Sequence, residues 1–144
     1  MAYSTYSDVT KEFKNIVFSS NSSVTSDDVT EFITQADAYI DSQIASKYIT
    51  PITGAESLKV LKRLSIWLVA GRIKMILKVK SGQDIGDQGN DSDLITMARD
   101  EIKDIVKGLV KLTDATLAIT GSGMKSYAND ENLEYTFKKG DDQW

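Results

Sequence analysis

The chain has no cysteine and no histidine among its 144 residues. Without cysteine, neither a disulfide framework nor a thiolate metal site can form. Without histidine, the chain lacks the usual general base near neutral pH and the commonest metal ligand, which excludes Ser-His and Cys-His catalysis. These absences do not forbid carboxylate chemistry, but the sequence indicates no pocket for it. We expect a protein that is not an enzyme, with no catalytic residues, no metal site and no cofactor.

Proline and long apolar runs are also scarce. Pro51 is the single proline, and the longest apolar run, from Ile66 to Ala70, is far too short to cross a bilayer. The first eight residues lack the basic and apolar regions of a secretory signal. The length suggests a single domain large enough to bury a core. These features predict a protein made in the cytoplasm, with no membrane partner.

Charge is distributed unevenly along the chain. Residues 1–55 carry three basic and seven acidic side chains, residues 56–80 seven basic and one acidic, and residues 81–144 seven basic and thirteen acidic. These charges either solvate helix faces or form complementary patches between neighbouring copies. The candidate interface charges of the second interpretation are Lys59, Lys62, Arg63, Arg72 and Lys74.

Apolar residues recur at helical spacing in four stretches. They predict helices over about 7–15, 26–49, 56–80 and 91–112, with Pro51 and Gly54 ending the second. The third is apolar nearly all round and is therefore expected to be central. The predicted fold is all-α, a small antiparallel bundle of about four helices.

The second predicted helix has two distinct faces. Its apolar stripe consists of Val29, Phe32, Ile33, Ala36, Ile40 and Ile44. Its polar face, expected to point to solvent, consists of Thr30, Glu31, Gln35, Asp37, Asp41 and Ser42. In the fourth predicted helix, the expected buried face includes Leu109 and Leu112.

The connection over 81–91 contains three glycines and three aspartates, Asp84, Asp87 and Asp91. An EF-hand requires an acid where Gly89 stands, and no Glu closes the loop. We therefore expect a solvated loop and no calcium site.

Beyond residue 112 the helical signal weakens, which divides the chain into a helical domain, 1–112, and a C-terminal arm, 113–144. Residues 113–120 fit either two more helical turns or a threonine-rich strand. The rest of the arm keeps large apolar side chains that disordered tails usually lack. It either folds back on its own bundle as a short β-hairpin or extends onto another chain. Its candidate anchors are Tyr127, Leu133, Tyr135, Phe137 and Trp144.

Three segments in order, 39–41, 45–52 and 58–66, carry a family resemblance. They contain Tyr-Ile-Asp, then Ala-Ser-Lys-Tyr-Ile-Thr-Pro-Ile, then Leu-Lys-Val-Leu-Lys-Arg-Leu-Ser-Ile. With the Met-Ala-Tyr start, this pattern over about residues 1–112 resembles the small head–tail connector (adaptor, or head-completion) proteins of tailed bacteriophages.

The resemblance implies an all-α structural protein of the virion neck. Such proteins commonly form a ring of twelve copies beneath the portal, embrace the portal with the C-terminal tail, and meet the next neck or tail protein on the other side. DNA passes through the ring without specific binding. On this interpretation the five arm residues contact the portal, and Asp84, Asp87 and Asp91 lie on the channel side.

An alternative of another class is a small helical regulatory or nucleic-acid-binding module. It would use the basic helix predicted over 56–80, and its DNA affinity would depend strongly on salt.

Overall fold

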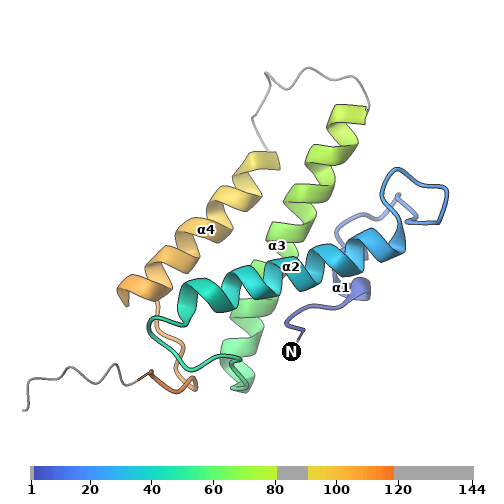
Figure 1. Ribbon diagram of the computed structural model, residues 1–144. Coiled ribbons are helices and arrows are strands. Elements are labelled where there is room, and N and C mark those ends of the chain that lie inside the picture. The colour runs from blue at the N-terminus through green and yellow to red at the C-terminus, as the bar shows by residue number, and fades with distance from the viewer. Residues whose placement is uncertain (1, 81–90, 119–144) are drawn as a thin grey trace, which may run out of the picture.

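The computed structural model describes residues 2–80 and 91–118. It contains four helices, α1 (Tyr6–Thr10), α2 (Ser26–Ile44), α3 (Ala55–Lys80) and α4 (Asp91–Lys107) (Figure 1). Within these ranges the only β-pairing is an isolated antiparallel bridge between Tyr48 and Leu117. The predicted all-α fold is confirmed, while the possible β-hairpin of the arm lies outside the described residues.

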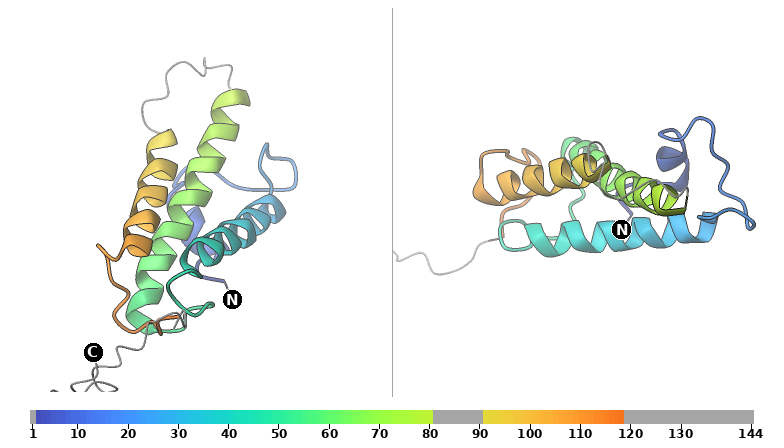
Figure 2. Two further views of the ribbon diagram at one scale, coloured as in Figure 1. Left: turned by 60° about the vertical axis from the view of Figure 1, so that its left-hand side comes forward. Right: turned by 90° about the horizontal axis from the view of Figure 1, so that it is seen from above.

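The helices form two layers. Helices α3 and α4 run antiparallel side by side, α1 lies on the other flank of α3, and α2 crosses beneath them (Figure 2, right). Helices α2 and α3 each contact the other three helices, and the most extensive interface joins α3 to α4. Helix α3 thus has the central position that its nearly continuous apolar surface predicts.

Two buried clusters fill the space between the layers. One lies between α4, the first half of α3 and the second half of α2, and the other lies between α1, the start of α2 and the middle of α3. The first contains Tyr3, Ile40, Ile44, Tyr48, Ile52, Leu61, Leu64, Ala98, Ile102, Ile105 and Leu112. The second contains Val9, Phe13, Phe18, Val24, Val29, Ile33, Ala36, Val69, Ala70 and Ile73.

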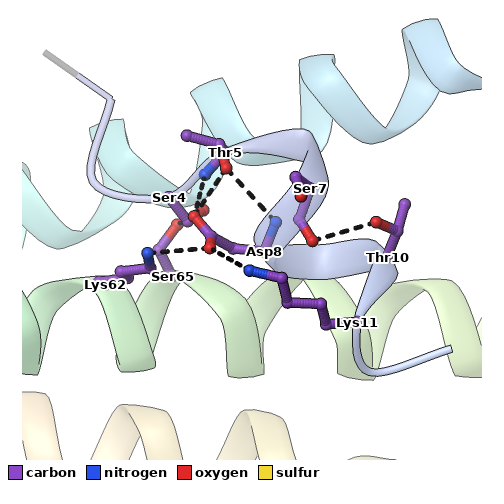
Figure 3. A network of polar contacts seen from close by, with 8 residues as sticks. All are labelled: Ser4, Thr5, Ser7, Asp8, Thr10, Lys11, Lys62 and Ser65. Atoms are coloured by element: carbon purple, nitrogen blue, oxygen red, sulfur yellow. Dashed lines mark hydrogen bonds and ion pairs between the residues drawn. The ribbon is translucent and has the colours of Figure 1, made fainter. Parts of the chain in front are cut away.

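Helices α1 and α2 each begin at a capping box. Thr5 and Thr25 accept a hydrogen bond from the backbone N–H of the aspartate three residues on, whose carboxylate accepts one from the threonine N–H in return. In α1 this aspartate is Asp8, which also pairs with Lys62 of α3 at 2.9 Å (Figure 3). These contacts hold the pKa of Asp8 well below its usual range, the Lys62 bond being the largest cause.

Three helices end earlier than the spacing of apolar residues predicts. Helix α1 ends at Thr10, not residue 15, and the chain then turns so that the rings of Phe13 and Phe18 meet edge to face with centroids 5.5 Å apart. Helix α2 ends at Ile44. The apolar residues that follow it pack into the first cluster, although their backbone is not helical.

Helix α4 ends at Lys107, not residue 112, because Gly108 adopts a left-handed φ of 86°. The N–H groups of Leu109 and Val110 then turn back to the carbonyl oxygen of Asp104. This turn leaves Leu109 75% exposed, so the prediction that it is buried was wrong, whereas Leu112 is buried as predicted.

No helix in the described part of the chain is long and apolar enough to cross a membrane.

Replacing Ile73 by Ala should lower the free energy of unfolding by about 2–5 kcal/mol, because Ile73 is fully buried in the second cluster and its truncation leaves a cavity. The matched change Val79→Ala on the same helix, at a residue 60% exposed, should stay within about 0.5 kcal/mol of the parent. Urea unfolding of both variants measures the difference. Equal effects would contradict the described packing of α3.

Candidate functional site

The first residues of the C-terminal arm are attached to the start of α3 by Asp114. Its carboxylate accepts hydrogen bonds from the N–H groups of Glu56, at 2.8 Å, and Ser57, at 2.9 Å, and from the Ser57 hydroxyl. The first N–H groups of a helix have no partner within it, and an acid suits its positive end. The Ser57 hydroxyl and these N–H groups lower the pKa of Asp114. The arm thereby supplies the cap that α3 needs.

Gly54 makes this approach possible. A Cβ atom at Gly54 would lie 2.6 Å from the main-chain oxygen of Asp114 and would also overlap its carboxylate. Only a residue without a side chain therefore lets the arm reach the start of α3.

The arm is also paired with the segment after α2. The N–H of Ile49 donates to the carbonyl oxygen of Thr116 at 2.9 Å, and the N–H of Ala118 donates to that of Lys47 at 2.8 Å, on either side of the Tyr48–Leu117 bridge. Over 113–118 the arm forms a turn at 113–115 followed by this isolated bridge, so neither the two further helical turns nor a regular strand is present there.

The end of α4 completes the attachment. The N–H of Leu112 donates to the Tyr48 hydroxyl at 3.3 Å, and the Lys47 ammonium donates to the carbonyl oxygen of Ile105 at 3.2 Å. We call residues 112–118, together with these partners, the arm root. The arm root thus joins the end of α2, the start of α3 and the end of α4, and lies at one end of the molecule (Figure 1).

The surface around the arm root is apolar and hollowed. Ile49, Leu109 and Leu117 are each more than half exposed there. A hollow of about 430 Å³ adjoins them, lined by Lys47, Tyr48, Lys111, Leu112, Thr113, Ala115 and Leu117. Exposed apolar groups beside a concave surface are typical of interaction sites. The arm root is therefore our candidate functional site.

The predicted interface charges are mostly engaged within the chain. Lys59 pairs with Glu56, Lys62 with Asp8, and Arg63 with Glu101. Arg72 donates to Gln35 and stacks over the ring of Phe32, with 4.0 Å between the guanidinium carbon and the ring centroid. Lys74 has no such partner in the part of the chain that the structure describes. Only the Lys59–Glu56 pair is exposed on both sides, and such pairs add little stability. The role of these basic groups between copies stays a prediction.

The other predicted site residues cannot be placed. The backbone of Asp91 forms the first residue of α4, but its side chain is not among those that the structure describes. Asp84, Asp87 and the arm residues Tyr127, Leu133, Tyr135, Phe137 and Trp144 lie outside the described residues.

A buried polar cluster was missed by the sequence reasoning. Asp37, expected to face solvent, is 5% exposed. Its two carboxylate oxygens accept hydrogen bonds from the N–H of Tyr3 at 2.9 Å and from the Ser65 hydroxyl at 2.7 Å. Burial raises the pKa of Asp37, although both donors act in the opposite direction.

This cluster holds the N-terminal segment between α2 and α3. The hydroxyls of Ser4 and Ser65 are 2.8 Å apart, and the Tyr3 hydroxyl donates to Asp41 while accepting from the N–H of Ile52 at 3.3 Å. Burial and the Asp41 contact raise the pKa of Tyr3. Asp37 shares the helical spacing of Ile33, Ile40 and Ile44, which was the available signal that it points inward.

The hydrogen bonds of the cluster join the N-terminal segment to α2, to α3 and to the segment that follows α2. Among residues 2–80 and 91–118, no group of three or more acidic side chains is placed to hold a metal ion.

Comparison with protein families, with curated proteins and with solved structures found no match to this chain.

Replacing Asp114 by Asn should lower stability at pH 7, because the N–H groups of α3 lose a charged acceptor. The folded-state pKa of Asp114 is lowered from 3.8. The ionised carboxylate therefore stabilises the folded state above the unfolded pKa, and this stabilisation is lost as pH falls through the folded pKa. The difference in unfolding free energy between parent and variant should therefore stay constant from pH 7 to about pH 5 and decrease as pH falls below about 4.

Denaturant unfolding at a series of pH values measures this difference. The control is Glu12→Gln, at an exposed side chain that makes no hydrogen bond or ion pair to another described residue. A gap for Asp114→Asn that stays constant down to pH 2 would contradict the assigned role of the charge.

Proposed function

We propose that this chain is a structural protein of the phage neck, a ring adaptor that joins the capsid portal to the tail and lets DNA pass. Two features support the proposal. One is the resemblance of residues 1–112 to head–tail connectors, and the other is the arm root. The observation that carries it is that the arm leaves the bundle from a point attached to three helices, directly before residues 119–144.

An attached root suits an arm that binds a partner. Each residue already ordered before binding removes part of the entropy that association costs. The aromatic side chains further along are of the kind that dominates interface energies. On this proposal Tyr127, Leu133, Tyr135, Phe137 and Trp144 contact the portal, and the apolar surface of the arm root faces it as well.

The remaining partners follow from the same proposal. Twelve copies form the ring, with basic groups of α3 near the subunit contacts, and the opposite end meets the next neck or tail protein. Acidic side chains over 84–91 face the channel, where like charge keeps passing DNA from adhering. The chain is made in the host cytoplasm, acts in the virion without enzymatic activity and contacts no membrane.

The nucleic-acid-binding alternative has no specific observation in its favour. Three of the five basic side chains singled out on α3 already pair with acids of the same chain. A DNA-binding surface needs basic groups that are available to phosphates.

Mass and shape test the proposal directly. Light scattering and negative-stain imaging of the chain, with and without a phage portal protein, should show rings alone or on the portal. A chain ending at Thr120 should lose portal affinity by at least a hundredfold, because it lacks all five aromatic and leucine anchors. A persistent monomer that ignores the portal but binds DNA with a steep salt dependence would favour the alternative.

The exposed apolar surface of the arm root should also matter. The double change Ile49→Asp and Leu117→Asp places two charges there and should weaken portal binding at least tenfold. Val17→Asp is the matched control, since Val17 is 80% exposed and lies before α2, away from the arm root. Binding is measured by biolayer interferometry and folding by circular dichroism. Unchanged affinity of the double variant would remove this surface from the interface.

A further inference from the structure

A second groove lies between α2, α3 and α4 and shares no residue with the arm root. Its volume is about 290 Å³, and it is lined by Phe32, Gln35, Ala36, Tyr39, Leu68, Val69, Arg72, Ile95 and Arg99. Ala36 and Val69 are buried, the two arginines are exposed, and most of the others are half-buried. The groove therefore combines an apolar floor with cationic groups at its opening.

Neither arginine is paired with an acid among residues 2–80 and 91–118. Arg72 donates to the side-chain oxygen of Gln35, whose amide in turn donates to Glu31 at 2.7 Å. Arg99 has no ion pair with any other described residue, and it lies one helical turn from the cationic Lys103. An occupant that brought both carboxylates and a large apolar side chain would satisfy these guanidinium groups and cover the floor.

The chain itself contains such a segment. Residues 130–137 read Asp-Glu-Asn-Leu-Glu-Tyr-Thr-Phe, with three acids, no basic residue and three large apolar side chains. We propose that the groove binds residues 130–137 of the same chain when the protein is free of partners. The carboxylates of this segment pair with Arg72 and Arg99, and its leucine and aromatic side chains cover the apolar floor.

The length of the arm permits this contact. Ala118 ends the arm root, and the twelve residues from there to Asp130 can span up to about 40 Å. The groove is closer to the arm root than this span, because Arg99 at its opening lies only about 12 Å along the axis of α4 from Lys107, where that helix ends. A tethered segment reaches an effective concentration in the millimolar range, so the chain's own segment outcompetes that of a second copy in dilute solution.

This inference concerns the free chain and does not depend on the proposed neck function. If that function holds, a portal would have to withdraw the arm from the groove, because the same side chains cannot contact both.

The absence of native cysteine allows a direct test in the full-length protein. Ile95→Cys, in the groove, is combined with Leu133→Cys, and the control pairs Thr96→Cys with the same arm change, since Thr96 follows on the same helix but does not line the groove. Mild oxidation of dilute protein, followed by non-reducing electrophoresis, should crosslink the groove pair as a monomer at least tenfold faster than the control. Adding Arg72→Glu and Arg99→Glu should remove this advantage.

A second pair guards against a folding defect at Ile95. Gln35→Cys, on the α2 side of the groove, is compared with Thr34→Cys, each combined with Leu133→Cys, and circular dichroism checks every variant. Equal crosslinking rates of groove and control positions would overturn the proposal. Crosslinks that form only between two chains would overturn it too, since they would assign the groove to a second copy.

Portal binding of the oxidised and reduced groove variant, measured separately, keeps this result apart from the neck hypothesis. A crosslinked monomer supports the groove contact whether or not the reduced protein binds a portal.

Discussion

The burial of α3 is the constraint on which the rest of the structure depends. Its 26 residues are apolar on most sides, so a single neighbouring helix cannot cover them. Helix α4 covers one flank, α1 the other and α2 the face beneath (Figure 2). Each covering helix contacts a different part of α3, so the two buried clusters lie at different positions along its length. For the same reason the two layers of helices cross instead of running parallel.

Polar contacts determine which segments occupy the remaining positions around α3. The buried Asp37 binds the backbone of Tyr3 on one side and Ser65 on the other, so the N-terminal segment is held against both α2 and α3. A buried carboxylate left without these two donors would be costly, so the positions of Tyr3 and Ser65 depend on each other. Asp114 plays a comparable part by capping α3.

The arm root and the groove give the C-terminal arm two relations to the bundle. The root attaches the beginning of the arm by backbone pairing and by a helix cap, both of which are independent of what the later residues contact. The groove offers a cationic and apolar surface whose chemistry complements residues 130–137. On the two proposals the arm has a fixed origin, and its aromatic part contacts either the groove of the free chain or a portal.

By itself the sequence determined the helical class, the approximate position of each helix and the central place of α3, because these depend on local periodicity and on Pro51. It also excluded thiol and histidine chemistry. Only the tertiary structure decided that Asp37 is buried, that Gly108 ends α4, that Asp114 caps α3 and that most basic groups of α3 contact the same chain. The physical reason is that each of these depends on a partner distant in sequence: Asp114 reaches Ser57, and Asp37 reaches Tyr3 and Ser65. Local spacing records which face of a helix is apolar, but it contains no information on which distant group meets that face.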